Sequence, residues 1–453
     1  MKEANCLDGK CAVFVTLGCK LNFAETSALC DRLQAQGVRR ARPGEAADIC
    51  IVNTCTVTET SNHKSRQAIH RVVRENPGAL VVVMGCYAQA CAEQVAAIGG
   101  VGLVVGMEQK GNVVELLRRH FPQHAARQGE GATPSGHIYS TDRKSIASFV
   151  PSCSRGTRTR YFIKIQDGCD YFCTYCAIPM ARGRSRNGSI ATVVEQARKA
   201  AQEGAREIVI TGVNIGDFGK STGERLLDLL AELDQIAGVA RYRISSIEPN
   251  LLTPEILEFC AKSRAFMPHF HIPLQSGSDA VLQLMHRRYD TRFFAEKIQS
   301  VRQFLPHAFI GVDVIVGMRG ETPELFEQTH AFVRGLDISQ LHVFTYSERP
   351  NTAALRIPYA VEEKEKRRRS QLLMALSEEK RKSFYRLHVG SVRPVLTEHG
   401  QAGQPVRGFT DNYVRVELPR LPYGHPLADN QIVQVQLGDF NKDQTALIGT
   451  IKE

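Results

Sequence analysis

Three closely spaced cysteines are the strongest chemical signal in this chain of 453 residues. Cys169, Cys173 and Cys176 stand in the segment GCDYFCTYC, a C-x3-C-x2-C spacing directly after an apolar run. Three thiolates on one short loop can ligate three irons of a 4Fe-4S cluster and leave the fourth iron open to a small molecule. Zinc is the alternative, but structural zinc usually takes four ligands. We therefore predict a 4Fe-4S cluster at this loop.

A second set of cysteines is scattered along the first hundred residues. Cys19, Cys55 and Cys86 end three separate apolar runs, in LGC, NTC and MGC. The loops that leave the carboxyl ends of parallel strands share one edge of a sheet, so these thiols are expected to converge on a second cluster. The alternative is that cysteine acts as a small buried hydrophobe, which we accept for Cys30 and Cys50. The cysteines interpreted as structural or incidental are Cys6, Cys11, Cys91, Cys153 and Cys260.

The elements around these cysteines predict an α/β protein of three domains. Short apolar runs at 12–19, 47–55, 80–88 and 102–106 alternate with helical patterns, which is typical of a parallel sheet covered by helices. This domain is predicted over residues 10–125. A linker is predicted over 126–154, where apolar residues are few.

Six further strand patterns predict a partial (βα)6 barrel over residues 155–385, with its active site at the carboxyl ends of the strands. They lie at 161–168, 207–214, 242–246, 270–276, 309–317 and 341–347. A charged helix is predicted over 361–387. Residues 386–453 change to short alternating strands with Gly and Pro turns, which favours a small β-barrel.

Composition narrows the class of protein. Hydrophobic residues make up 43% and charged residues 23% of the chain, no apolar run approaches the roughly 18 residues of a membrane span, and no signal peptide is apparent. We therefore expect a cytoplasmic globular protein that does not associate with a membrane. The net charge of +10 makes a polyanionic partner a hypothesis worth testing.

The positive charge is unevenly distributed. Residues 151–200 hold nine Lys and Arg against three acids, and we predict that this patch contacts RNA phosphates. The nine are Arg155, Arg158, Arg160, Lys164, Arg182, Arg184, Arg186, Arg198 and Lys199. Residues 385–453 are neutral, with seven of each sign. An RNA face on the terminal barrel therefore requires its arginines to gather with two aromatic residues. These are Arg386, Arg393, Arg407 and Arg415 with Phe409 and Tyr413.

The motifs resemble one known family throughout the chain. LGCKLN, NTCTVT, GCYAQ and GCDYFCTYCAIPMARGRSR are similar to the motifs of the radical SAM methylthiotransferases, and residues 387–450 resemble a TRAM domain. Within that family, GCKLN and NTCTVT look most like the enzymes acting on N6-threonylcarbamoyladenosine in tRNA. Enzymes for prenylated adenosine tend to read GCQMN.

The resemblance implies two 4Fe-4S clusters and S-adenosylmethionine. It gives Cys169, Cys173 and Cys176 the reducing cluster, on which S-adenosylmethionine is cleaved to a radical that abstracts hydrogen from C2 of the adenine. It gives Cys19, Cys55 and Cys86 the auxiliary cluster that delivers sulfur, so the product is the 2-methylthio derivative. Placing substrate, cofactor and sulfur in contact while excluding water suits such an unselective radical.

Other positions match the family with less detail. Tyr175 would contact the adenine of the cofactor, with plain packing as its alternative role. Gly317 and Glu321, in VDVIVGMRGET, would lie beside the cofactor. Ser246, Glu248 and Gln275 follow predicted strand ends and could line the pocket. His269 and His271 are interpreted as pocket or core groups rather than metal ligands.

The expected partners are the tRNA anticodon stem-loop and an electron donor such as flavodoxin or ferredoxin, with the enzyme a monomer. Two alternative substrates stay open, namely prenylated adenosine in tRNA and an aspartate of a ribosomal protein. A different class also stays open, namely a non-catalytic RNA-binding protein whose cysteines hold zinc.

Overall fold

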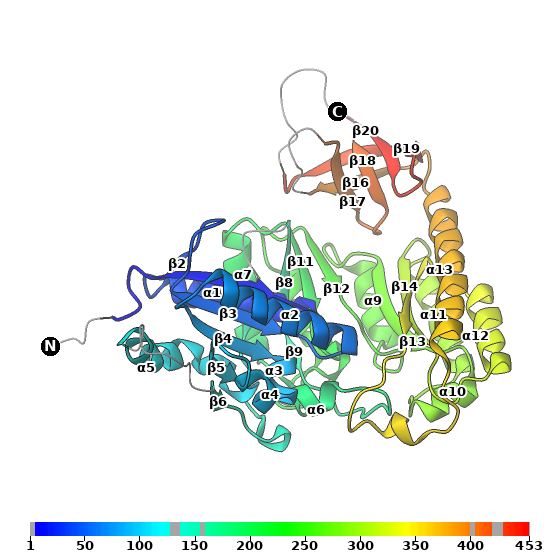
Figure 1. Cartoon of the computed structure of the whole chain (residues 1–453). Coiled ribbons are helices and arrows are strands. Elements are labelled where there is room, and N and C mark those ends of the chain that lie inside the picture. Colours follow the sequence, from blue (N-terminus) through cyan, green and yellow to red (C-terminus); the bar gives the residue numbers. More distant parts are fainter. Residues whose placement is uncertain (1–4, 127–135, 155–158, 399–403, 419–428, 453) are drawn as a thin grey trace.

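A six-stranded parallel sheet forms the first domain of the computed structural model, which describes residues 5–126, 136–154, 159–398, 404–418 and 429–452 (Figure 1). The strand order is β2-β1-β3-β4-β5-β6, and every neighbouring pair is parallel. The strands are β1 (Cys11–Thr16), β2 (Arg39–Arg40), β3 (Ile49–Thr54), β4 (Leu80–Gly85), β5 (Val101–Val105) and β6 (His137–Tyr139). The predicted parallel sheet is confirmed. Strand β6 falls within the predicted linker.

Alternate residues of these strands face helices on opposite sides of the sheet. One face packs Ile49, Ile51 and Val82 with α1 (Lys20–Gln34) and α5 (Val113–Ala126). The other face packs against α2 (Glu59–Glu75), α3 (Cys86–Ala90) and α4 (Ala92–Ala96). Burial on both faces explains why the strands are continuous apolar runs.

The second domain is an open barrel of six parallel strands, as predicted. Its order is β8-β11-β12 in one sheet and β13-β14-β15 in the other, and parallel bridges Tyr242–Phe266 and Ser246–His271 join the two. The strands are β8 (Arg160–Lys164), β11 (Glu207–Thr211), β12 (Arg241–Ile244), β13 (His269–Gln275), β14 (Phe309–Val316) and β15 (Gln340–Thr345). Along the open side, α1 of the first domain contacts β8 and β7 (Ser152–Cys153), which pairs antiparallel with β8.

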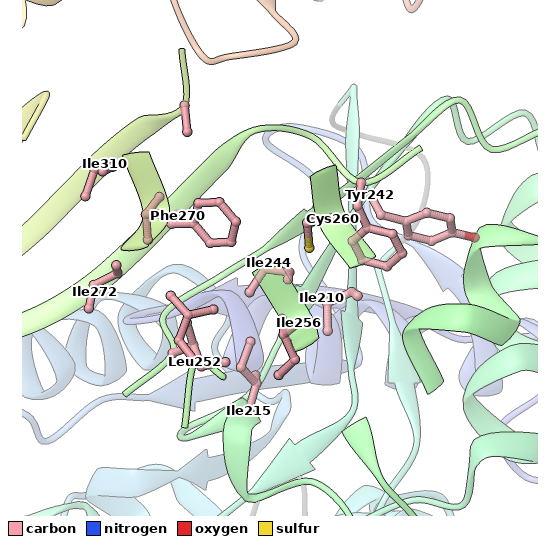
Figure 2. Packing of buried hydrophobic residues seen from close by; sticks show 14 of the residues in the cluster. Ile210, Ile215, Tyr242, Ile244, Leu252, Ile256, Cys260, Phe270, Ile272 and Ile310 are labelled. Carbon is pink, nitrogen blue, oxygen red and sulfur yellow. The ribbon is translucent and has the colours of Figure 1, made fainter. Parts of the chain in front are cut away.

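Helices cover the outside of this barrel and bury one large hydrophobic cluster. They are α7 (Ile190–Gln202), α8 (Leu226–Asp234), α9 (Pro254–Lys262), α10 (Asp279–Leu284), α11 (Thr291–Phe304), α12 (Pro323–Gly335) and α13 (Glu363–Arg386). Figure 2 shows part of the cluster, with Ile244 and Phe270 of the strands close to Ile256 and Cys260 of α9. Cys260 is thus a buried packing residue, in line with its structural interpretation.

The chain ends in a closed five-stranded barrel that follows α13 (Figure 1). Its strands are β16 (Val392–Thr397), β17 (Val406–Thr410), β18 (Arg415–Leu418), β19 (Ile432–Phe440) and β20 (Leu447–Ile451). Two buried arginines of β12 fasten the terminal barrel to the six-stranded barrel. Arg241 donates to the carbonyl oxygens of Phe409 and Pro394, at 3.0 and 2.8 Å, and Arg243 donates to those of Asp411 and Thr410, at 2.8 and 2.9 Å.

The two aromatic residues that an RNA face on this terminal barrel would require make contacts within the protein. The Phe409 and Tyr413 rings stack 4.6 Å apart, and Tyr413 also lies 4.3 Å from the His269 ring of β13. Arg160 lies 4.7 Å from the Phe409 ring and donates to the Tyr413 hydroxyl at 3.0 Å. Both aromatic side chains are half-buried and therefore contribute to the contact between two domains.

Candidate cluster sites and the barrel interior

The first cysteine trio lies at one edge of the first domain. Cys55 and Cys86 directly follow β3 and β4, and Cys19 lies three residues beyond β1, so the three follow adjacent parallel strands. Cys19 is exposed, whereas Cys55 and Cys86 are buried. Gly18 (φ +95°) packs so closely on Cys55 that a Cβ there would lie 2.8 Å from the cysteine Cβ. The glycine of the LGC motif thus permits the loops to approach each other.

Asn22 fixes the loops that carry this trio. Its Nδ2 donates to the carbonyl oxygens of Leu17 and Thr54, at 2.8 and 2.9 Å. Asn53 of β3 donates in turn to the Asn22 carbonyl oxygen at 3.0 Å. The asparagines of the GCKLN and NTC motifs therefore hold the Cys19 and Cys55 loops together.

The second trio lies on the loop that follows β9 (Gln166–Asp167) at the carboxyl end of the barrel. Gln166 Nε2 donates to the Gly168 carbonyl oxygen at 2.7 Å, and Gln166 Oε1 accepts from the backbone N–H groups of Val213 and Asn214. Backbone N–H groups also point at two of the sulfurs, from Tyr171 to Cys169 at 3.5 Å and from Ile178 to Cys176 at 3.4 Å.

Arg287 is a site residue that the sequence analysis missed. It lies just after α10, where its Nη1 donates to Cys173 Sγ at 3.2 Å while its Nη2 pairs with Glu248. Hydrogen bonds donated to the ligating sulfurs tune the reduction potential of iron–sulfur clusters. The HRRYD segment carried a signal only as charge, because nothing in its spacing links it to a cysteine about a hundred residues earlier.

A buried charge network joins the two domains between the trios. Glu25 of α1 pairs with Lys110 of η1 (Glu108–Asn112), with Lys164 of β8 at 2.8 Å and with Arg182 of α6 (Ile178–Arg182) at 3.2 Å. Asp167 pairs with Lys164 at 2.6 Å, with Arg182 at 2.8 Å and with Arg186 at 3.4 Å. Burial would raise the pKa of both carboxyls, but the surrounding cations hold both pKa values well below the ordinary range.

Arg182 connects this network to the first trio. Its Nε donates to Cys86 Sγ at 3.2 Å, and its Nη2 donates to Asn22 Oδ1 at 2.6 Å. Burial raises the pKa of the Cys86 thiol to about 11, and Arg182 and Lys110 act against that rise. The four cations outnumber the two carboxylates, so the network favours a negative group beside Cys86.

The predicted phosphate-binding patch is therefore wrong for several of its members. Lys164 is 2%, Arg182 1% and Arg186 6% exposed, because all three neutralise buried carboxylates. Arg184, Arg198 and Lys199 are exposed. Arg155 and Arg158 lie outside the described residues. Counting charge along the sequence could not separate buried from exposed cations, since alternate residues of one strand or loop face opposite ways.

The interior of the barrel is polar. On β13, Phe270 and Ile272 pack with the helices while His269 and His271 alternate with them, and the same holds for Val312 and Asp313 on β14. His271 Nε2 lies 2.6 Å from Asp313 Oδ1, and the His271 and His342 rings are 4.8 Å apart. The histidines are thus engaged as pocket or core groups, as interpreted from the sequence.

Lys20, next to Cys19, lies near this interior. Burial lowers the pKa of its ammonium group, Tyr413 and Asp313 act to raise that pKa, and Arg160 acts to lower it. Its side chain is nevertheless exposed and makes no hydrogen bond or ion pair with any residue that the structure describes. Lys20 is therefore an accessible cation that no residue in the described ranges pairs.

Two residues predicted beside the cofactor make contacts within the protein. Gly317 (φ +76°) donates its N–H to Glu321 Oε1 at 3.0 Å, and the space that a Cβ would fill there is taken by Lys366. Glu321 also pairs with the fully buried Arg369, and its Oε2 is buried without a partner. Tyr175 packs with Met285 and neighbouring apolar residues. Their cofactor roles stay predictions.

The three pocket residues lie at strand ends, as expected. Ser246 is half-buried beside His271, and Glu248 pairs with Arg287. Gln275 ends β13 with φ +72° at an irregular step in the register with β14. A non-glycine residue in this left-handed conformation is costly and often marks a functional site. Their contact with a ligand stays a prediction.

The residues present fit iron–sulfur clusters by the donors directed at their sulfurs. Within the ranges described, no three His, Cys, Asp or Glu side chains form a ready set of ligands for a metal ion. The fit of these cysteines to iron–sulfur clusters therefore rests on two observations. The Cys19 and Cys55 loops are held together, and N–H groups are directed at Cys169 and Cys176 and guanidinium groups at Cys173 and Cys86.

Comparison with known proteins decides the family. The model of uncharacterized protein family UPF0004 matches residues 11–106, and that of the radical SAM superfamily matches residues 163–333. The threonylcarbamoyladenosine tRNA methylthiotransferase MtaB of Bacillus subtilis is 36% identical over 441 residues, covering 93% of this chain and 96% of that protein. This chain belongs to the radical SAM methylthiotransferases. It is a transferase, so the alternative of a non-catalytic zinc protein is wrong.

Two further matches show how far the comparison reaches for the substrate and for the fold. The tRNA-2-methylthio-N(6)-dimethylallyladenosine synthase of Carboxydothermus hydrogenoformans is 30% identical, covering 85% of this methylthiotransferase and 87% of that protein. The radical S-adenosylmethionine methyltransferase TsrM of Kitasatospora setae matches in structure with a TM-score of 0.56 at 16% identity, covering 76% of this chain and 77% of that chain. The latter supports the fold alone. Membership of the radical SAM superfamily entails a 4Fe-4S cluster and S-adenosylmethionine. No helix among the described residues is long and apolar enough to cross a membrane.

Proposed function

We propose that this enzyme methylthiolates C2 of N6-threonylcarbamoyladenosine beside the anticodon of tRNA. The observation that carries the proposal is the similarity to MtaB over nearly the whole chain, which holds for relatives from Bacillus subtilis and Aquifex aeolicus at 36% and 34% identity. The identity to the dimethylallyladenosine enzyme is lower, at 30%. Prenylated adenosine is therefore the second candidate substrate.

The two cysteine trios have separate roles in this proposal. Cys169, Cys173 and Cys176 hold the reducing cluster, and Cys19, Cys55 and Cys86 hold an auxiliary cluster. When bound, the first supplies the electron that cleaves S-adenosylmethionine and the second supplies the sulfur. The chain itself orients the two sites through hydrogen bonds of Arg287, Asn22 and Arg182.

Lys20 supports the choice of substrate. The threonylcarbamoyl group carries a carboxylate, whereas a prenyl group is an uncharged hydrocarbon. The Lys20 ammonium group is accessible, is paired by no described residue, and lies next to Cys19 and close to Asp313 and Tyr413. Such a group is suited to the carboxylate, whereas burying it beside a prenyl chain costs desolvation free energy. We assign Tyr175, Gly317 and Glu321 to the cofactor side of the pocket, and Ser246, Glu248 and Gln275 to its wall.

The remaining partners follow from this chemistry. The anticodon stem-loop presents the modified base, a small protein such as flavodoxin or ferredoxin supplies electrons, and the enzyme acts as a monomer in the cytoplasm. The exposed Arg184, Arg198 and Lys199 are available for phosphate contacts.

The test is nucleoside mass spectrometry of total tRNA from a strain lacking the gene. We expect the 2-methylthio form of threonylcarbamoyladenosine to disappear and its precursor to accumulate. Loss of the prenylated 2-methylthio nucleoside instead supports the second candidate. If every tRNA nucleoside is unchanged, the proposal fails and the aspartate of a ribosomal protein becomes the substrate to examine.

A further inference from the structure

One fully buried guanidinium group touches both halves of the proposed reaction centre. Arg182 donates to Cys86 Sγ and Asn22 Oδ1 in the first domain, at 3.2 and 2.6 Å. In the radical SAM barrel it donates to Asp167 Oδ1 at 2.8 Å, two residues before Cys169. It also reaches Glu25 Oε1 at 3.2 Å. All three nitrogens of the guanidinium group are therefore engaged.

The other cations of the network do not share this geometry. Lys110 pairs with Glu25, Lys164 with Glu25 and Asp167, and Arg186 with Asp167 and backbone carbonyl oxygens. Of the four, only Arg182 donates to a cysteine sulfur. The planar fork of arginine makes this possible, because it fixes several donors in different directions at once.

A donor and a positive charge beside a cluster ligand have a definite electronic effect. A cluster gains negative charge when it is reduced, so an N–H···S hydrogen bond and a nearby cation favour the reduced form and raise the reduction potential. The guanidinium group is buried and therefore poorly screened by water. Its influence on a cluster at Cys86 is correspondingly strong.

We propose that Arg182 is the positioning residue of the auxiliary cluster, raising its reduction potential through Cys86 and fixing it relative to the Cys169 loop through Asp167. This inference rests on the second cluster proposed above. It concerns how that cluster is tuned, whichever modified adenosine is the substrate.

The experiment isolates the auxiliary cluster in the full-length chain. Cys169, Cys173 and Cys176 are replaced by Ala, the protein is reconstituted anaerobically with iron and sulfide, and a redox titration is followed by electron paramagnetic resonance. Arg182→Gln and Arg182→Lys are compared with Arg184→Gln, which removes an exposed arginine two residues away. Bound iron and circular dichroism are measured for each variant.

We expect the midpoint potential to shift to more negative values in Arg182→Gln, to shift less in Arg182→Lys, and to stay unchanged in Arg184→Gln. Arg182→Lys keeps the charge, so it remains informative where Arg182→Gln does not fold. An unchanged potential and spectrum in both Arg182 variants overturns the role of Arg182 alone. Absence of iron from the parent protein that lacks the three barrel cysteines overturns the auxiliary cluster, and with it this inference.

Discussion

Each end of the radical SAM barrel contains a buried carboxylate surrounded by cations, but the two arrangements serve different purposes. At the amino end, Glu207 is buried among Arg160, Arg241 and Arg243, at distances of 2.9 to 3.7 Å. At the carboxyl end, Asp167 is buried among Lys164, Arg182 and Arg186, at 2.6 to 3.4 Å. Each carboxylate gathers three cations, and five of these six are buried, whereas the Arg160 side chain is 18% exposed.

The two ends differ in what the arginine N–H groups contact when they do not pair with the central carboxylate. Arg241 and Arg243 donate to backbone carbonyl oxygens of the terminal barrel, which closes that end with fixed neutral acceptors. Arg182 donates to Asn22 and to the sulfur of Cys86, an acceptor that can change its charge and hold a metal. The amino end is therefore structural, and the carboxyl end carries the chemistry.

The largest expected effect comes from replacing one cysteine in each trio. Cys173→Ala should abolish cleavage of S-adenosylmethionine, because we propose that this thiol holds the reducing cluster. Cys55→Ala should leave cleavage intact and stop sulfur insertion. The readouts are 5′-deoxyadenosine by chromatography and the methylthiolated nucleoside by mass spectrometry. Equal loss of cleavage in both variants contradicts separate roles for the two trios.

Replacing one buried carboxylate at each end tests whether the ends are independent. Glu25→Gln and Glu207→Gln should each lower the free energy of unfolding by about 3–5 kcal/mol, since each leaves buried cations unpaired. Glu25→Gln should also reduce the iron retained at the auxiliary site, whereas Glu207→Gln should keep it. Urea titration and iron analysis give the two readouts. Loss of iron in Glu207→Gln contradicts the structural assignment of the amino end.

The buried Glu25 carboxylate also predicts that the free energy of unfolding depends on pH. The cations hold the pKa of Glu25 below its unfolded value of about 4.3, so its contribution to stability is complete above that pH and is lost as the pH falls further. Unfolding free energies measured from pH 6 to pH 3 should therefore fall less steeply in Glu25→Gln than in the parent. Parallel curves for the two proteins count against a stabilising ionised Glu25.

Sequence reasoning predicted the three-domain α/β fold because its signals are local. The apolar runs became β1, β3, β4 and β5, and the six later runs became the strands of the open barrel. Adjacent parallel strands necessarily bring their carboxyl ends to one edge, so the placement of Cys19, Cys55 and Cys86 at that edge was also foreseeable.

The partners of those cysteines were not foreseeable. Arg182 and Arg287 reach Cys86 and Cys173 across 96 and 114 residues, and no periodicity encodes such contacts. The same gap explains the error over the basic patch, where Lys164 and Arg186 were counted as surface charge. It also explains why the sequence does not reveal that the half-buried Tyr413 ring contacts His269 of another domain.

Lys20, beside the barrel interior, extends the comparison to a cation whose side chain is exposed. Lys20→Gln should lower kcat/KM for tRNA carrying threonylcarbamoyladenosine by about 10- to 100-fold, which corresponds to losing a charged hydrogen bond of about 1.5–3 kcal/mol. Lys64→Gln, at an exposed lysine of α2, is the matched control. Steady-state kinetics on tRNA bearing either modification provides the measurement. An equal loss on prenylated tRNA contradicts recognition of the carboxylate by Lys20.

The smallest expected effect is on tRNA binding and comes from the exposed Arg184, whose neighbours Arg182 and Arg186 are buried. Arg184 is exposed at the carboxyl end, two residues from Arg182, so Arg184→Gln should leave stability unchanged and reduce the salt dependence of tRNA binding by about one phosphate contact. Arg206→Gln removes an exposed arginine just before β11, at the amino end, and should leave that slope unaltered. Binding measured between about 50 and 200 mM salt distinguishes them. An equal decrease in both variants means that tRNA contacts both ends, and the amino end is then more than a structural seal.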